Sequence, residues 1–343
     1  MTLWADGRID FTYGRDVNRG IEEGVVGIAP GRAEGAVTLV DFSTSGVSGS
    51  GALAETFRVD DTVDLVAIAR KLYRTHGDEY QQLVVFTNRP VGGLRQGYFA
   101  FELNIRNTDE GVGLGVVDHS AEFGSAGRLE SFVMMESIGK YPDDLNEPAL
   151  DHVSALSILA QEAGHRWLAR AVFRDGETIS RELLGRARVH WSFYLDSDGS
   201  HLEGNEIENL GGGQFWTGTP GVRFSPLDQY LMGYRPAEEV PSFFFVRPQG
   251  PGTSSPERPP EAGVSFTGTR KDVTIGDVIG GLGPRKPPAG PREPFRQAFI
   301  FVSVGEAPDP ARVEKVERFR LAWEPFFARS MDGRGTVDTR LTP

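Results

Sequence analysis

The sequence predicts an α+β protein in which a twisted mixed sheet precedes a loop-rich C-terminal half. Three observations favour this class. Short apolar runs of strand length outnumber helical patterns in the first half of the chain. The 43 glycines and 22 prolines favour many turns over a helical bundle. The 343 residues suffice for a large core, in one large or two ordinary domains.

The first half begins with residues 1–24, which are glycine-rich and charged and predict a separate N-terminal β and loop segment. A helix is predicted around residues 60–73, because Leu65, Ile68, Ala69 and Leu72 repeat with helical spacing. Strands are predicted in "GVVGIAPG", "GAVTLVDFSTSG", "QQLVVFTN", "GYFAFELNIRN", "GVGLGVVDHS" and "GRLESFVMMESIG".

A second helix is predicted over residues 154–173, "SALSILAQEAGHRWLARAVF". It closes an upper subdomain of residues 25–175. The lower subdomain, residues 176–343, is predicted to be mostly loop as far as residue 262. A short helix, a strong strand "FRQAFIFVSVG" and an amphipathic helix are predicted to follow.

Composition excludes several classes of function. The net charge of −12 argues against a general nucleic-acid partner and against docking on anionic membranes. The absence of cysteine excludes disulfides, thiol nucleophiles and cysteine-held metals. No apolar run is long enough for membrane insertion. The N-terminal residues show no signal-peptide core, and the compartment stays open, with export after signal removal slightly favoured.

The second helix carries the pattern Gln161-Glu162-Ala163-Gly164-His165. Residues four apart project from one helix face, so Gln161 and His165 could hold a metal from one side. With histidine at position 161 the pattern would be H-E-x-x-H, in which the glutamate is the general base of a zinc peptidase. A glutamine amide is a weaker zinc ligand than imidazole.

Three interpretations of this helix stay open. The site is incomplete and empty, with Gln161 hydrogen-bonded in a disused pocket. Alternatively Glu162 and His165, three apart, hold a metal in a rearranged ligand set. The third interpretation is a packed core helix whose histidine is satisfied by hydrogen bonds.

The run "LAQEAGHRWLA" resembles the active-site helix of the zincin metallopeptidases, and the order of elements over residues 25–175 resembles their upper subdomain. The resemblance implies a sheet over this helix and an edge strand lining a substrate cleft, for which residues 111–135 are the best candidate. The pieces "QEAGHRWLA", "HWSF", "EGN" and "SPLD" also resemble those of a poorly characterised family of zincin-like bacterial proteins.

Only Glu162 and His165 match the zincin pattern, and Gln161 departs from it. The resemblance implies a further metal ligand downstream, and each candidate has a structural alternative. The candidates are Asp228 on a short helix, His190 in an apolar strand-like piece, Glu203 before a glycine turn and, less favoured, His201.

The segment from Asp196 to Glu206, "DSDGSHLEGNE", is dense in oxygen ligands and resembles a calcium loop. Asp196, Asp198 and Ser200 alternate as calcium ligands do, although Gly199 and Glu203 break the register. A solvated acidic turn is the alternative interpretation.

The function expected from these observations is a zincin-fold metal-dependent hydrolase, most plausibly a peptidase, with Glu162 as general base and His165 as metal ligand. Zinc would be its cofactor, with calcium as a further cation, and a peptide or protein its substrate. The alternative is a catalytically inactive zincin-fold protein that binds a partner or has a structural role. A purely local resemblance on a different fold is the third hypothesis.

Overall fold

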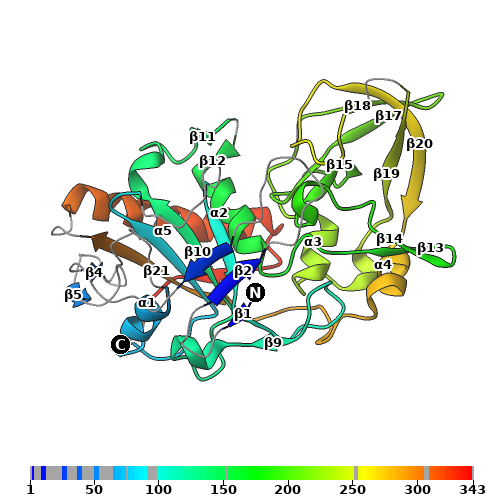
Figure 1. The fold of residues 1–343 in the computed structure, drawn as a ribbon. Helices are drawn as coiled ribbons and strands as arrows, with labels where there is room; N and C mark the ends of the chain where they lie inside the picture. The colour runs from blue at the N-terminus through cyan, green and yellow to red at the C-terminus, as the bar shows by residue number, and fades with distance from the viewer. Residues whose placement is uncertain are drawn as a thin grey trace.

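The structure is a computed structural model that describes residues 2–3, 9–12, 25–28, 37–40, 50–53, 65–74, 76–90, 99–151, 153–250, 254–304 and 309–341. The chain contains both helices and mixed sheets, so the protein has the predicted α+β class (Figure 1). A small N-terminal sheet contains β1 (Thr2–Leu3), β2 (Ile9–Thr12) and β3 (Val25–Ile28).

The first large sheet has the strand order β5-β4-β21-β6-β10-β7, and β22 pairs with β21 off this path. Its central strands β21, β6 and β10 are parallel, whereas β7, β4 and β5 are antiparallel to their neighbours. The strands are β4 (Val37–Val40), β5 (Ser50–Leu53), β6 (Gln82–Thr87), β7 (Phe101–Asn104), β10 (Ser131–Ser137), β21 (Phe295–Val304) and β22 (Val337–Asp338).

Alternate residues of a strand point to opposite sides of its sheet. Helices cover both faces of this sheet and pack on these two sets of residues. Val84 and Phe86 of β6 pack in one core with α2 (Ala155–Gly164) and α5 (Pro310–Ser330). Leu83 and Val85 pack on the other side with α1 (Leu65–Leu72). All six residues of β6 are therefore buried, as its apolar sequence predicts.

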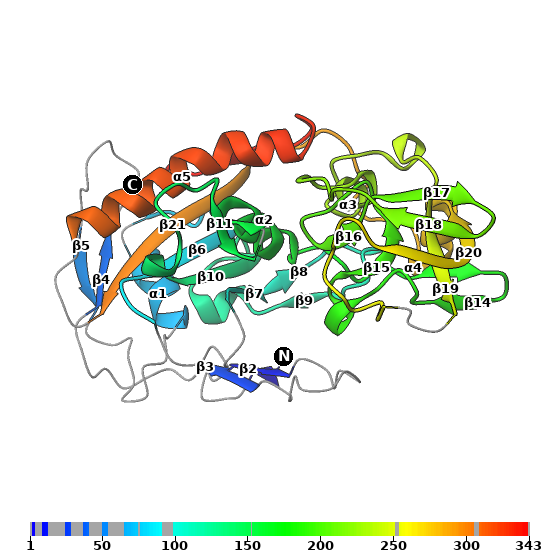
Figure 2. The same ribbon diagram turned by 90° about the horizontal axis from the view of Figure 1, so that it is seen from above.

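The sheet order also shows where the C-terminal segment lies. Strand β21, which the sequence interpretation assigned to the lower subdomain of residues 176–343, lies between β4 and β6. Helix α5 packs on the same sheet (Figure 2). The last part of the chain therefore returns to the first sheet.

A second large sheet of six strands corrects the expectation that residues 176–262 are mostly loop. Its order is β16-β15-β19-β20-β18-β17. Several strands have an exposed polar face, so their apolar residues are too few to be recognised locally. The strands are β15 (Trp191–Asp196), β16 (Glu203–Asn205), β17 (Ile207–Gly211), β18 (Gln214–Thr217), β19 (Phe243–Gln249) and β20 (Ser265–Val273).

The segment "GVGLGVVDHS", residues 111–120, contributes only the two-residue β9 (Val117–Asp118) in place of the predicted strand. Gly111 and Gly113 have positive φ, and the backbone of Gly113 packs so closely on Arg170 that a Cβ would lie 2.3 Å from its carbonyl oxygen. Among the described strands the edge of the first sheet nearest α2 is β7, so the edge strand precedes residues 111–135 in the chain.

Helix α2 is shorter than predicted and ends at Gly164. The Ser154 hydroxyl caps its first turn by accepting a hydrogen bond from the Ser157 backbone N–H. All its residues are buried except Gln161, which is partly exposed, so the helix is central and not amphipathic. A Cβ on Gly164 would lie 2.7 Å from Leu202 Cδ2, so the glycine allows the 200–203 segment to pack closely.

The remaining elements are short. None of the described helices has an apolar stretch of the length needed to cross a bilayer. The elements are α3 (Pro226–Leu231), α4 (Ile275–Leu282), η1 (Ser120–Phe123), η2 (Ile138–Lys140), η3 (Arg186–Arg188), η4 (Ala237–Glu239), β8 (Arg106–Asn107), β11 (Pro148–Leu150), β12 (Val153–Ser154), β13 (Phe173–Asp175) and β14 (Thr178–Ser180).

Candidate functional site

The polar end of α2 meets a turn and two strands of the second half of the chain. Gln161 contacts His190, the residue before β15, with 3.4 Å between the two Nε2 atoms. The rings of His165 and His190 lie edge to face, with centroids 4.9 Å apart. Glu203 at the start of β16 joins the group, with its Oε1 3.8 Å from His190 Nε2. Of the predicted downstream ligands, His190 and Glu203 lie in this site, and Asp228 does not.

His190 has a defined orientation. Its Nδ1 lies 3.0 Å from the carbonyl oxygen of Arg186, which can only accept, so Nδ1 carries the proton. Its Nε2 therefore presents a lone pair, and the Arg186 guanidinium donates to it from Nη2 at 2.9 Å. Burial lowers the pKa of His190, with Arg186 adding to the effect, so the imidazole is neutral at physiological pH.

Arg186, which the sequence did not single out, is central to the site. Its Nε donates to Glu203 Oε1 at 2.9 Å, and its Nη2 is bonded to the same oxygen. The second oxygen of Glu203 is buried without a hydrogen-bond partner. The arginine side chain remains 37% exposed, whereas that of Glu203 is 8% exposed. A basic residue in a charged run carries no local sign of such a role.

His165 follows the last residue of α2 and is buried. Burial lowers its pKa to about 3, and the positive charges of Arg170 and Arg186 add to this. Its Nδ1 is buried with no hydrogen bond of normal geometry. The site therefore contains two neutral imidazoles in edge-to-face contact.

Glu162 lies within electrostatic range of a second acid, Glu102. The pKa of Glu162 is raised to about 8, first by burial and then by the charge of Glu102 on β7, while Arg186 and Lys140 oppose the shift. Burial also raises the pKa of Glu102 to about 7. No hydrogen bond joins the Glu162 carboxylate to another described residue. Burial therefore favours the neutral form of the Glu162 carboxyl. The role of general base that the zincin resemblance implies for Glu162 stays a prediction.

The zinc that the resemblance implies does not fit these residues as they stand. In the part of the chain described, ligand atoms of three histidine or acidic side chains come within 4.8 Å of one another only at Asp196, Asp198 and Glu206. His165, His190 and Glu203 do not converge in this way. The cation that contacts His190 and Glu203 is the guanidinium of Arg186.

Asp228 has a different role from the predicted ligand, and we remove it from the ligand set. It is fully buried, and both of its oxygens accept hydrogen bonds: from Trp191 Nε1 at 2.8 Å, from Ser200 Oγ at 2.6 Å and from the Ser225 backbone N–H at 2.8 Å. It also closes a capping box with Ser225 at the start of α3. Asp228 therefore joins β15, the 200 loop and α3.

His201 is likewise structural. Its Nε2 lies 3.0 Å from the Ser330 hydroxyl, and its ring packs against Phe224 and Phe326. Burial lowers its pKa to about 3. The His201 side chain therefore joins the loop around residue 200 to the end of α5.

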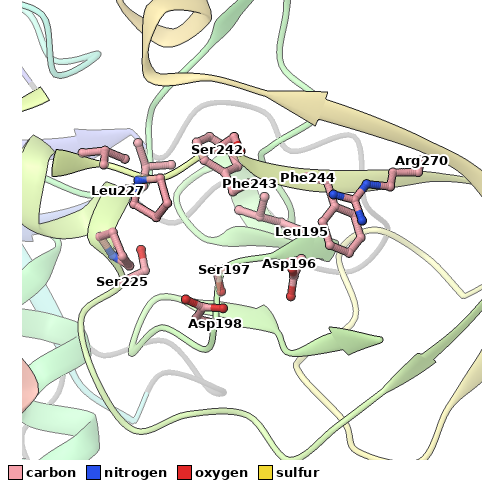
Figure 3. Close-up of a pocket in the computed structure, with 13 residues that line it drawn as sticks. Leu195, Asp196, Ser197, Asp198, Ser225, Leu227, Ser242, Phe243, Phe244 and Arg270 are labelled. Atoms are coloured by element: carbon pink, nitrogen blue, oxygen red, sulfur yellow. The ribbon is translucent and has the colours of Figure 1, made fainter. Parts of the chain in front are cut away.

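The predicted calcium loop forms an acidic cluster of different membership. Asp196, Asp198 and Glu206 converge, whereas the Ser200 hydroxyl donates to Asp228 and Glu203 pairs with Arg186. Asp196 and Asp198 line a pocket opposite Phe243 and Phe244 (Figure 3). The Arg223 guanidinium pairs with Asp198 at 3.0 Å, and the Ile207 backbone N–H donates to Asp196. Protein groups therefore already engage two of the three acids.

Comparisons of this chain with protein-family models, with curated proteins and with solved structures find no match. The geometry of the residues themselves is therefore the basis of the functional interpretation.

Proposed function

We propose that this chain is a zincin-like protein without a catalytic metal, which acts as a binding or structural protein. One observation carries the proposal. The acceptor atoms His190 Nε2 and Glu203 Oε1, which would face a metal, are bonded to the guanidinium of Arg186. Gln161, at the position of the first histidine, adds a neutral amide to the same group.

The proposed partner is a peptide or protein segment. This follows the zincin resemblance, in which an extended substrate lies along the edge strand beside the active-site helix. Strand β7 is in that position: it pairs with β10 on one side and ends the sheet order of the described strands. Peptide binding there should slow hydrogen exchange of the Phe101–Asn104 amides without cleavage of the peptide.

A metal-dependent hydrolase, with Glu162 as base and His165 as metal ligand, is the second candidate. The observation that favours it is the Glu162 carboxyl, buried and without a hydrogen bond to a described residue. Strongly perturbed acids of this kind are enriched at catalytic sites.

Metal content and peptidase activity of the purified protein distinguish the two. After zinc loading and dialysis, the wild type should retain no stoichiometric zinc and should leave a panel of unstructured peptides intact. Glu162→Gln and His165→Ala should then match the wild type in both measurements. Bound zinc lost in His165→Ala, with cleavage lost in Glu162→Gln, would establish the hydrolase instead.

A further inference from the structure

We propose that Arg186 is a built-in cation that occupies the space between His190 and Glu203, where a metal ion would otherwise bind. This inference deepens the proposed function and rests on it. Arg186 both neutralises the buried Glu203 carboxylate and donates a hydrogen bond to the lone pair of His190.

The first argument is charge. Glu203 is buried, and an unpaired buried carboxylate is strongly unfavourable. Among the described residues, the cation that forms a salt bridge with it is Arg186. Nearby cations are engaged elsewhere: Lys140 with Glu136, Arg166 with Glu130, and Arg170 with the carbonyls of His165 and Leu168. Arg186 is therefore the described cation that offsets the buried charge of Glu203, against the effect of burial, which raises the pKa of this acid.

The second argument is the orientation of His190. Metal-binding histidines commonly donate their other ring N–H to a carbonyl or carboxylate, which aims the free lone pair at the metal. His190 has this arrangement, with the Arg186 carbonyl as acceptor and the Arg186 guanidinium in the place of the metal. The backbone of Arg186 thus orients the ring, and its side chain occupies the resulting lone pair.

The third argument is the backbone on both sides of the ion pair. Ala187 and Arg188 have φ of 55° and 54°, and Glu203 has φ of 71°. Such values are costly for residues with a Cβ and persist where surrounding contacts fix them. The turn is fixed by hydrogen bonds from Gly185 N–H to the His190 carbonyl and from Arg188 N–H to the Gly185 carbonyl. The turn that carries Arg186 is therefore fixed by its own hydrogen bonds, next to the Glu203 backbone.

Removal of the side chain alone tests the proposal, because the backbone carbonyl that orients His190 remains. The variants are Arg186→Ala and Arg186→Gln, with Arg188→Ala as the matched control in the same turn, where the arginine is exposed. Arg186→Gln keeps a donor without the charge and serves as the test if the alanine variant fails to fold. Thermal unfolding and equilibrium dialysis are carried out with and without zinc.

We expect both Arg186 variants to unfold at a lower temperature than the wild type, and zinc to raise that temperature saturably. Their zinc dissociation constants should be at least about tenfold lower than that of the wild type, a change of about 1.4 kcal/mol in binding free energy. Arg188→Ala should match the wild type. Adding His190→Ala to either variant should abolish the response to zinc.

Two results would overturn the inference. Arg186 variants that are as stable as the wild type and as indifferent to zinc would show that the guanidinium replaces nothing. A zinc response that survives His190→Ala would place the ion elsewhere. Either result leaves the metal-free wild type, and so the proposed function, in place. The proposed function fails on a separate measurement, which is wild-type peptidase activity that requires Glu162.

Discussion

At the scale of single residues, the buried acids of this protein differ in what satisfies them. Asp228 receives three hydrogen bonds from other residues, Glu203 has one oxygen paired and one orphaned, and Glu162 accepts none from a described residue. Both oxygens of Asp228 are already engaged by protein donors, whereas an unsatisfied acid in a core must have some other reason to persist. This difference separates the structural acid from the candidate site.

We predict that Asp228→Ala destabilises the fold by roughly 3 kcal/mol or more, because three buried donors lose their acceptor together. Asp277→Ala is the matched control, since Asp277 holds the same position in the capping box of α4 but is only partly buried. It should cost only about 1 kcal/mol. Urea unfolding measures both, and equal losses would contradict the account.

The pKa of Glu102 predicts how stability varies with pH. Burial raises it to about 7 from an ordinary value of 4.5, so the folded state binds more protons than the unfolded state between these values. Glu102 therefore contributes stability that is lost as pH rises through this window, by up to about 1.4 kcal/mol for each unit of pKa difference. The lowered pKa values of the buried His165, His190 and His201 act in the opposite direction below about pH 6.5, so the effect of Glu102 is measured by comparing variants.

Glu102→Gln should flatten that decline, and the exposed Glu177→Gln should leave it unchanged. Urea unfolding at a series of pH values between 4 and 9 measures the slope. A Glu102→Gln variant whose stability varies with pH as that of the wild type does would refute the assignment of a buried, protonated Glu102.

The sequence brought forward Gln161, Glu162, His165, His190 and Glu203. The structure places four of them in contact, and Glu162 lies within electrostatic range of Arg186, which pairs with Glu203. Their residue types and resemblance to a known pattern made this possible. Arg186 could not be found in this way, because its role depends on a turn that brings residue 186 against residue 203. Asp228 misled because an acid among apolar residues predicts burial and a partner, but not which partner.

At the scale of elements, α2 depends on the close packing of its last residue. A Cβ at Gly164 would lie 2.7 Å from Leu202 Cδ2 and 3.0 Å from Phe224 Cε1, and both side chains are fully buried. We predict that Gly164→Ala costs about 1–3 kcal/mol through overpacking.

Gly276→Ala on α4 is the control, because its nearest neighbour would be Thr274 Oγ1 at 3.4 Å. It should be neutral or stabilising by up to about 1 kcal/mol through helix propensity. Thermal unfolding of the two variants decides the point. A neutral Gly164→Ala would mean that the 200–203 segment is free to move away from α2.

Local signals also explain which elements were predictable. The predicted helix over residues 154–173, the short helix carrying Asp228 and the apolar strands correctly indicated α2, α3, β6 and β21. The length of α2 was overestimated, since the chain beyond Gly164 continues apolar but turns at His165. The second sheet was missed because strands such as β20 bury few side chains and gain their pairing from distant partners.

At the scale of the whole molecule, the position of β21 ties the two ends of the chain together. It lies between β4 and β6, and its parallel pairing with β6 spans the six residues Gln297–Val302. Such a contact has no local sequence signal, so the predicted boundary at residue 175 could not take it into account. The first sheet is incomplete without residues from the last part of the chain.

A polypeptide of residues 25–175 is therefore predicted not to fold by itself, because it lacks the strand beside β6 and the helix over it. Circular dichroism and urea unfolding should show no cooperative transition. Adding residues 291–343 as a separate polypeptide should restore part of the helical and strand signal. Cooperative unfolding of residues 25–175 alone would contradict the central role of β21.

The central question is whether Arg186 or a metal ion occupies the space between His190 and Glu203. A crystal structure of the wild-type protein grown with zinc, with anomalous diffraction recorded at the zinc edge, measures this. We predict Arg186 Nη2 within hydrogen-bond distance of His190 Nε2 and no anomalous peak beside His165 or His190. A zinc peak bound by His190 and Glu203, with the Arg186 side chain displaced into solvent, would contradict the account.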